Sequence, residues 1–190
     1  MILVIINLRG TSGSGKSTIV RKLNGHYRTF YHIFEEGRRQ PISTLYFNPV
    51  DLVGSLFIPG HYETACGGCD TIKTPDKVYE LIRAAIVSNW NIIYEGIIIQ
   101  DDTRRLIELN AQYPVNIIEL STPIEDCLAG VQARRNARGD TRSLATKNTV
   151  DRFVRVHRTN DKLRSQGFVI PILGREEAHQ YCLSLLKSHE

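Results

Sequence analysis

The sequence lacks any apolar run approaching the roughly 20 residues that a helix needs to cross a membrane, so we expect no membrane partner. Its apolar N-terminal segment also lacks the basic start of a signal peptide, and we expect a core strand there. Only four of the 190 residues are cysteines, which favours free thiols over a disulfide framework. With 42% hydrophobic and 23% charged residues, the composition is typical of a soluble globular protein, and we expect a cytoplasmic location.

No internal repeat, low-complexity tract or linker divides the chain, so we expect a single domain over residues 1–190. The net charge of +4 is unevenly distributed, because Val131 to Ser165 contains ten Lys and Arg residues against three Asp and Glu residues. A basic segment of this kind usually faces a phosphate-rich ligand, and a solvated helix face is the alternative.

The most informative segment is Gly-Thr-Ser-Gly-Ser-Gly-Lys-Ser-Thr, which lies between an apolar run and a helical pattern. It matches G-x-x-x-x-G-K-[ST] in the strand–loop–helix setting that a phosphate-binding loop requires, which disfavours an ordinary turn. The glycines allow backbone N–H groups to surround a phosphate, Lys16 can reach the β- and γ-phosphates, and Ser17 can ligate Mg²⁺. We therefore predict a nucleoside triphosphate site made of Gly10, Thr11, Ser12, Gly13, Ser14, Gly15, Lys16, Ser17 and Thr18.

Apolar runs alternate with helical patterns, which predicts a parallel sheet with helices on both faces. Helix starts are expected at Thr74-Pro75 and, with a capping box, at Thr122 to Glu125. A further helix is expected over 147–164. Its inward residues are expected to be Val150, Phe153, Val154 and His157. The expected strands are Met1–Leu8, Tyr31–Glu35, Asn91–Ile99, Val115–Leu120 and Phe168–Leu173.

Two stretches interrupt this alternation of strands and helices. Residues 37–71 form a long insert with two β-like pieces, Ser43–Phe47 and Leu52–Ile58, and an insert of this length is usually functional. We expect it to bind the acceptor of a transferred group. Residues 133–142 are basic and contain Gly139, which predicts a mobile lid between two helices.

Charged side chains are expected around the phosphate loop. Glu95 ends an apolar strand, and in a doubly wound sheet that end lies beside the loop, where a carboxylate can hold Mg²⁺ or its waters. A local hydrogen bond is the alternative role for Glu95. Arg134, Arg135 and Arg138 can stabilise charge on a phosphoryl group and help to exclude water, and Arg134 is also expected to bind the nucleotide.

These features resemble the P-loop kinases of the nucleoside-monophosphate-kinase architecture over most of the chain. The resemblance implies an α/β, three-layer P-loop NTPase fold with a five-stranded parallel sheet, helices on both faces and an arginine-rich lid over ATP. Glu95-Gly96 stands where those kinases often have Asp-Gly. It continues as Ile97-Ile98-Ile99-Gln100 without the Asp-Gly-x-Pro-Arg signature, which disfavours an adenylate or guanylate kinase.

The acceptor side is expected in the densest part of the insert. Asp70 follows the pair Gly67-Gly68, which permits close backbone approach, and it is the preferred residue to orient or deprotonate an acceptor hydroxyl. Capping of a following helix is its alternative role. Tyr62 can stack on a base.

A charged group after the expected second strand offers a second acceptor position. Glu35 or Glu36 could be the base instead of Asp70. Arg38 or Arg39 could bind an acceptor phosphate, although a solvated cluster is equally compatible with the pattern. Cys66-x-x-Cys69 lacks two further ligands nearby, so a structural zinc site is disfavoured and the role of both cysteines stays open.

The stretch from Gly60 to Thr71, with Gly-His-Tyr followed by Cys-Gly-Gly-Cys-Asp-Thr, is similar to kinases of tailed bacteriophages. Some of those kinases phosphorylate the hydroxymethyl group of 5-hydroxymethyluracil in phage DNA. The resemblance implies a phage-encoded kinase in the host cytoplasm. From the residues alone, the acceptor can be a nucleoside, a nucleotide or a base within DNA.

Two other classes of function are weighed against a kinase. Asp51 to Gly54 matches the D-x-x-G pattern of a GTPase-like switch, but no clean core strand precedes it and no Asn-Lys-x-Asp sequence follows. A nucleic-acid-stimulated ATPase is disfavoured because the chain is short for two motor lobes.

Overall fold

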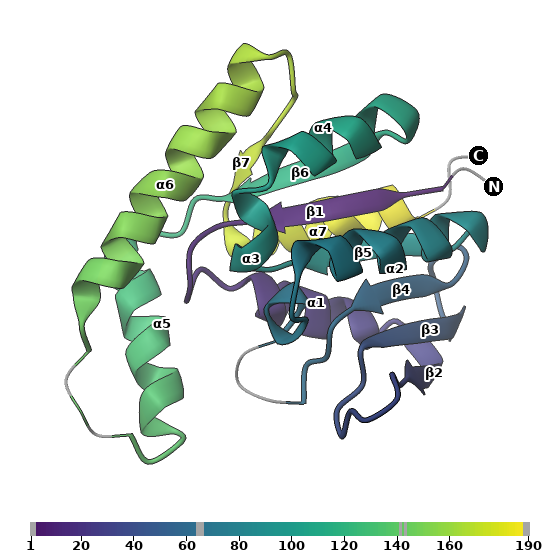
Figure 1. Ribbon diagram of the computed structural model, residues 1–190, viewed down its shortest axis with the longest axis horizontal. Helices are drawn as coiled ribbons and strands as arrows, with labels where there is room; N and C mark the ends of the chain where they lie inside the picture. Colours follow the sequence, from purple (N-terminus) through teal and green to yellow (C-terminus); the bar gives the residue numbers. More distant parts are fainter. Residues whose placement is uncertain (1–2, 64–66, 141, 143, 188–190) are drawn as a thin grey trace.

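The computed structural model describes residues 3–63, 67–140, 142 and 144–187. Its centre is a seven-stranded sheet in the order β2-β3-β4-β5-β1-β6-β7 (Figure 1). The strands are β1 (Ile5–Arg9), β2 (Tyr27–Ile33), β3 (Ser43–Pro49), β4 (Leu56–Pro59), β5 (Asn91–Glu95), β6 (Val115–Leu120) and β7 (Ile172–Leu173).

The sheet is mixed. Strands β4, β5, β1, β6 and β7 pair in parallel, whereas β2 with β3 and β3 with β4 pair antiparallel. The α/β class is confirmed, but the sheet differs from the expected five-stranded parallel one. The two β-like pieces of the 37–71 insert are β3 and β4 of the main sheet. Their connections, 34–42 and 50–55, are shorter than the dozen or so residues of a helical crossover, so antiparallel pairing follows.

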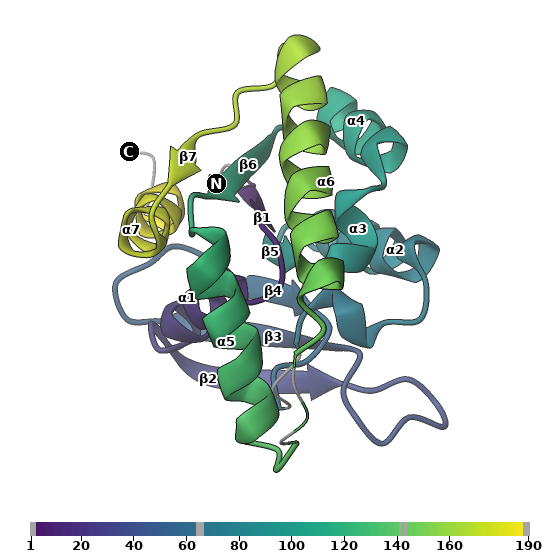
Figure 2. The same ribbon diagram turned by 90° about the vertical axis from the view of Figure 1, so that its left-hand side faces the viewer.

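Helices cover both faces of the sheet. Figure 2 shows α1 and α7 on one face, α2, α3 and α4 on the other, and α5 and α6 in front of the edge at which β1 ends. The helices are α1 (Lys16–Asn24), α2 (Pro75–Val87), α3 (Ile97–Gln100), α4 (Thr103–Gln112), α5 (Ile124–Asn136), α6 (Thr146–Ser165) and α7 (Arg175–Leu186).

The central strands are apolar on both sides because both sides are covered. In β1, Ile6 and Leu8 pack with Ile19 of α1, while Ile5 points the other way and packs with Ile82 of α2. Alternate residues of a strand face opposite sides of the sheet, so a nearly unbroken apolar run serves two cores.

The local sequence predicts the start of α2 correctly and the cap of α5 incorrectly. The Thr74 side chain accepts a hydrogen bond from the Lys77 backbone N–H at the start of α2, as the sequence predicts. The capping box expected at Thr122 is wrong, because Pro123 precedes α5 and the Thr122 hydroxyl donates instead to the Ser14 carbonyl over 2.7 Å. Thr122 therefore supports the phosphate loop rather than its own helix.

Several expected boundaries also move. The strand expected over 91–99 ends at Glu95, because residues 97–100 form α3. Helix α6 does not bury Val150 and Val154 as expected, since both remain nearly 40% exposed. Its buried residues are Thr149, Val156, Asn160 and Leu163. Within the described ranges, we find no helix with the length and apolarity that a membrane span requires.

Candidate active site

Most of the predicted site residues line a cleft of about 800 Å³ at the carboxyl edge of the sheet. The phosphate loop, the end of β5, the η1 turn (Cys69–Thr71) and α5 each contribute to it. Six basic and three acidic side chains line this cleft, which favours a polyanionic ligand. The charged residues are Lys16, Arg21, Arg134, Arg135, Arg138, Arg175, Asp70, Glu95 and Asp126.

The phosphate loop owes its shape to close packing on α5. Gly13 has a φ of 82°, and a Cβ atom there would lie 2.0 Å from the Cys127 carbonyl oxygen, so no larger residue fits. Gly15, with a φ of 103°, directly precedes α1. Ser12, Gly13 and residues 15–18 line the cleft, whereas Gly10, Thr11 and Ser14 lie behind it. Some residues of the predicted loop therefore line the cleft, and the others are buried beneath it and support the loop.

Lys16, Ser17 and Glu95 form the centre of the cleft. The Ser17 hydroxyl donates to Glu95 Oε1 over 2.7 Å, and Lys16 Nζ lies 4.0 Å from Glu95 Oε2. Lys16 also donates to the carbonyls of Gly10 and Thr11 over 2.8 and 2.9 Å. Burial raises the pKa of the Glu95 carboxyl and lowers the pKa of the Lys16 ammonium, and the charge of each partly offsets the shift of the other.

Tyr62 supports Glu95 instead of lining the cleft. Its hydroxyl donates to Glu95 Oε1 over 3.2 Å, and the Arg21 guanidinium lies 5.7 Å from the centre of its ring. A Cβ atom on Gly67 would lie 2.6 Å from the Tyr62 ring, and one on Gly68 would lie 2.6 Å from the Glu95 carbonyl oxygen. The glycine pair thus permits the close approach expected from the sequence. The predicted stacking of Tyr62 on an acceptor stays a prediction.

Asp70 lies in η1 with an exposed side chain on the cleft wall. Its Oδ1 atom accepts a hydrogen bond of 2.9 Å from the Ile98 backbone N–H in the first turn of α3. The carboxylate therefore bonds to a helix distant in sequence, and the helix that follows it, α2, is capped by Thr74 instead of by Asp70 as the alternative had it. Asp70 also faces the same space as Lys16 and Ser17.

Glu36 and Arg38 do not line the cleft. Arg38 donates to the Thr71 carbonyl over 3.0 Å and so ties the segment after β2 to η1, while Glu35 lies 3.3 Å from Lys77 Nζ. In this arrangement Asp70 is better placed than Glu35 or Glu36 for chemistry next to the phosphate loop.

The cysteine pair is only partly described, because Cys66 lies outside the described residues. Cys69 is buried, and burial raises the pKa of its thiol well above the ordinary value. Across the described residues, no group of three or more His, Cys, Asp or Glu side chains could hold a metal ion. Ser17 and Glu95 fit Mg²⁺ that arrives with a nucleotide, because phosphate oxygens and waters usually complete its coordination.

The segment expected to form a lid, 133–142, is partly helical. Helix α5 continues to Asn136, so Arg134 and Arg135 project from its last turn, and Arg138 follows directly. Arg135 pairs with Asp140 over 2.9 Å. Hydrogen bonds from Arg142 and Arg135 hold the pKa of the Asp140 carboxyl well below its usual range. Arg134 and Arg135 therefore take their directions from the last turn of α5 and not from a loop.

Other contributors to the cleft were missed in the sequence. Arg175, the first residue of α7, donates to the Ser14 carbonyl over 3.0 Å and packs against Gly15. It follows β7 by two residues, and the carboxyl ends of parallel strands are where ligands bind, so its position was a usable signal. Arg21 lies one turn after Ser17 in α1 and was equally accessible to that reasoning.

A buried polar network holds the loop from behind. Arg9 is fully buried and donates to Asn160 Oδ1 over 2.6 Å and to the Gln100 carbonyl. The Gln100 side chain in turn makes two hydrogen bonds of 3.0 Å with the Gly10 backbone. This network joins the start of the phosphate loop to α3 and α6.

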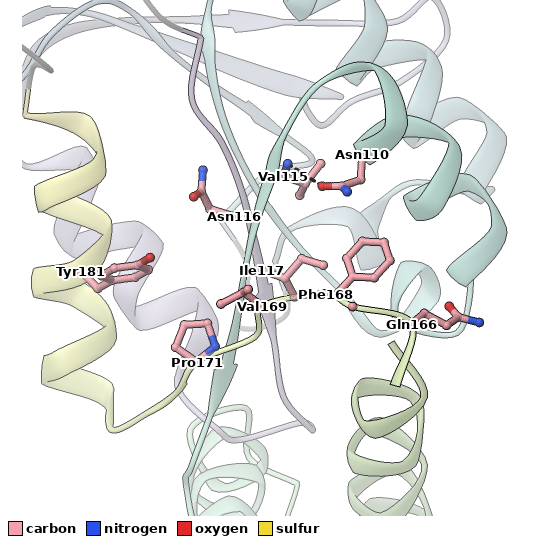
Figure 3. Close-up of a pocket in the computed structure, with 10 residues that line it drawn as sticks. Asn110, Val115, Asn116, Ile117, Gln166, Phe168, Val169, Pro171 and Tyr181 are labelled. Carbon is pink, nitrogen blue, oxygen red and sulfur yellow. Dashed lines mark hydrogen bonds between the residues drawn. The ribbon is translucent and has the colours of Figure 1, made fainter. Parts of the chain in front are cut away.

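A smaller hollow of about 330 Å³ lies at the opposite edge of the sheet, between the start of β6, the 166–171 segment and α7 (Figure 3). Asn110 accepts a hydrogen bond from the Val115 backbone N–H beside it. The described residues that line it include no carboxylate, histidine, lysine, arginine or cysteine. It therefore offers none of the charged chemistry found in the cleft.

No protein-family model matches the chain, but three relatives do. The chain is 36% identical over 186 residues to the 5-hmdU DNA kinase of Pseudomonas phage PaMx11, which covers 97% of both sequences. It is 26% identical to the 5-hmdU DNA kinase of Delftia phage PhiW-14, over 86% of this chain and 65% of that protein. It is 22% identical to the 5-hmdU DNA kinase of Bacillus phage SP10, over 87% of this chain and 26% of that protein.

The resemblance to phage kinases that the sequence suggests is thereby confirmed, and the chain is an enzyme of the kinase class. Because the match to the Pseudomonas phage protein spans nearly the whole of both sequences, the chain belongs to the family of 5-hmdU DNA kinases.

Proposed function

We propose that the chain is a single P-loop NTPase domain over residues 1–190, acting in the cytoplasm of a phage-infected host. It transfers the γ-phosphate of ATP to the hydroxymethyl oxygen of 5-hydroxymethyluracil within DNA. The observation that carries this proposal is the cleft, where the phosphate loop, Glu95, Asp70 and the α5 arginines meet in a chain related to 5-hmdU DNA kinases.

The donor half of the cleft suits a Mg²⁺–triphosphate. On nucleotide binding, Lys16 Nζ exchanges its hydrogen bonds to the Gly10 and Thr11 carbonyls for phosphate oxygens. Ser17 and Glu95 would hold the metal directly or through waters. Mg²⁺ held there would supply neutralisation of the charge on the phosphates.

The acceptor half supplies the proton acceptor and the charge stabilisation. Asp70 orients the hydroxymethyl group and takes its proton as the oxygen attacks the γ-phosphorus. The new O–P bond forms as the bond from the γ-phosphorus to the β,γ-bridging oxygen breaks, and ADP leaves. Arg134 and Arg138 stabilise the charge that spreads over the transferred group.

A DNA acceptor is supported by the charge of α6. Its exposed cations Lys147, Arg152, Arg158 and Lys162 have no acidic partner within the part of the chain that the structure describes. Cations of this kind bind DNA phosphates without reading sequence. A base that reacts inside a narrow cleft must leave the stack, at a cost of a few kcal/mol that such backbone contacts help to offset.

The GTPase-like alternative is weaker in this fold. Asp51 pairs with His26 over 2.9 Å, in the segment that precedes β4. That segment lies at the amino edge of the sheet, opposite the phosphate loop, where the D-x-x-G pattern cannot reach a γ-phosphate. The kinase proposal rests on charged residues that line the cleft and does not need this segment.

The deciding experiment incubates the enzyme with γ-labelled ATP and separate pools of nucleosides, nucleotides, normal DNA and hydroxymethyluracil DNA. We expect stable label in hydroxymethyluracil DNA alone, with a rate that falls steeply as salt is added. Label only in free phosphate would identify an ATPase or a switch. Label in a free nucleoside, with little dependence on salt, would identify a small-molecule kinase.

A further inference from the structure

Strand β2 is the outer strand at one end of the sheet (Figure 1). It exposes a row of aromatic rings. Phe30 and Phe34 are 58% and 57% exposed. The ring centres of Phe30 and His32 lie 4.9 Å apart, and those of His32 and Phe34 lie 6.3 Å apart. Because these residues are spaced by two along the chain, their rings follow one face of the strand.

This row is larger than an isolated exposed side chain. Tyr46 of β3 extends it, with its ring centre 5.8 Å from that of Phe30. Edge strands normally carry charged side chains or proline that discourage association, and a contiguous apolar patch usually marks a binding surface. We therefore expect a ligand or a partner molecule to cover this row of rings.

The row leads toward the cleft. Strand β2 is antiparallel to β3 and β3 is antiparallel to β4, so β2 runs in the same direction as β4 and β5. Phe34, just after β2, thus lies at the same edge of the sheet as Glu95. His32 Nε2 is 3.6 Å from Glu63 Oε1, and the adjacent Tyr62 hydrogen-bonds to Glu95.

Charges of both signs border the row, because Glu35 and Glu36 follow Phe34 and Glu63 lies beside His32, while arginines lie on its other sides. Arg28 is exposed on the same strand and, by its spacing, on the same face as Phe30 and His32. Arg21 of α1 lies between Tyr62 and the cleft that it lines. Aromatic rings flanked by arginines are the combination that binds unstacked nucleotides, because rings stack on bases while cations contact phosphates.

We propose that Phe30, His32 and Phe34 form a platform on which the bases next to the reacting base of the acceptor DNA stack, with Arg28 contacting the backbone. This inference rests on the proposed function. Moving one base into the cleft leaves its neighbours without a stacking partner, and the platform replaces the contact they lose. The occupant is nucleic acid and not a second copy of the chain, because the row ends at the edge of the sheet where the proposed function places the reacting base of DNA.

The test compares a Phe30→Ala/Phe34→Ala variant with Tyr31→Ala. Tyr31 is 65% exposed on the same strand, but its side chain faces the opposite side of the sheet. Phosphorylation of a short oligonucleotide with one hydroxymethyluracil is measured, together with fluorescence of a 2-aminopurine beside that base. The double variant should raise KM for the oligonucleotide about tenfold or more and lose the quenching of 2-aminopurine.

In the same test, kcat, KM for ATP and the unfolding temperature should change little, because both rings are more than half exposed and lie outside the cleft. Tyr31→Ala should match the wild type. Phe30→Tyr should keep the quenching, and Phe30→Leu should lose it, since stacking and not apolarity is responsible.

The platform is wrong if the double variant keeps wild-type KM and quenching. It is also overturned if the wild type sediments as a dimer, the double variant as a monomer, and KM for the oligonucleotide is unchanged. Failure of the proposed function is a different result, in which the wild type transfers no label to hydroxymethyluracil DNA. The quenching assay needs no catalysis, so it decides the platform even then.

Discussion

The Ser17 hydroxyl donates a 2.7 Å hydrogen bond to Glu95 Oε1, which joins the start of α1 to the end of β5. The two residues are far apart in sequence and meet because β1 and β5 are parallel neighbours, with Leu8 opposite Glu95. One hydroxyl and one carboxylate do not form a complete metal site. In the proposed reaction they would form the protein side of a site whose other ligands come with the nucleotide.

Lys16→Ala should abolish most phosphoryl transfer while leaving the protein folded. The ammonium group donates only to carbonyls of its own loop, which a triphosphate would replace. Loss of a charge that stabilises the transferred phosphates should lower kcat by roughly 10²-fold or more. Steady-state kinetics and circular dichroism check this, with Lys22→Ala on the same helix as the control. Unchanged transfer in folded Lys16→Ala protein would contradict the assignment of the loop.

Tyr62→Phe should move the acidic limb of the pH–rate profile to higher pH. Burial already raises the pKa of Glu95, and the hydrogen bond from Tyr62 opposes that rise. Without the donor, the charged carboxylate loses stabilisation and its pKa rises further. Activity that needs the carboxylate is then lost earlier as acid is added.

Tyr46→Phe is the matched control for this profile, because the Tyr46 hydroxyl accepts a hydrogen bond from Asn24 and does not contact Glu95. If Tyr62 instead stacks on the acceptor, Tyr62→Phe should leave the profile unchanged, and Tyr62→Ala should raise KM for the acceptor at every pH. The two roles of Tyr62 are thereby separated.

Arg134→Ala and Arg138→Ala should lower kcat more than they lower ATP affinity. Both side chains line the cleft, and charge that is stabilised only in the transition state appears in kcat. Arg104→Ala is the control, since Arg104 pairs with Glu108 on the surface of α4. Should both cleft variants alter only the unfolding temperature, these arginines are structural.

The local parts of the site were predictable from the sequence, and the tertiary parts were not. The phosphate loop is a contiguous motif, and Glu95 ends an apolar strand, so spacing alone identifies both. The contact of Arg9 with Asn160 depends on how α6 packs across β1, which no local pattern encodes. At Thr122 a local pattern is present but misleads. The sequence matches a capping box, yet the Thr122 hydroxyl donates to the Ser14 carbonyl and does not cap α5.

The sheet illustrates the same limit. Periodicity identified β3 and β4 as β-like pieces, but their place beside β5 depends on pairing between distant residues such as Leu56 and Asn91. Pairing is set by the packing of whole faces and the lengths of connections, so the sequence predicts an insert and not two strands of the main sheet.

Gly13→Ala should destabilise the protein and weaken ATP binding together. A Cβ atom would lie 2.0 Å from the Cys127 carbonyl oxygen, so the loop or α5 must shift. Gly139→Ala is the control, because its φ of 74° is also positive but no atom lies within 4 Å of the added carbon. The control should cost about 1 kcal/mol in urea unfolding, from backbone strain alone. An equal cost for both variants would show that the loop does not pack tightly on α5.

Asp70→Asn should lower phosphoryl transfer by roughly 10²-fold or more, because the amide cannot take the proton of the acceptor hydroxyl. The substitution keeps an oxygen that can accept the hydrogen bond from the Ile98 backbone N–H, so η1 and α3 should stay in place. ATP binding should be nearly unchanged, since Lys16 and Ser17 hold the triphosphate from the other side of the cleft. Single-turnover transfer and ATP titration measure the two effects separately.

Glu36→Gln is the informative partner of that variant, because Glu36 is exposed and does not line the cleft. It should retain full transfer. If Asp70→Asn retains activity while Glu36→Gln or Glu35→Gln loses it, the base follows β2, and the segment tied to Thr71 by Arg38 must move into the cleft during the reaction. If only Asp70→Asn loses activity, the hydrogen bond from the Ile98 backbone N–H orients the Asp70 carboxylate toward the acceptor. The second carboxylate oxygen then stays available to take the proton.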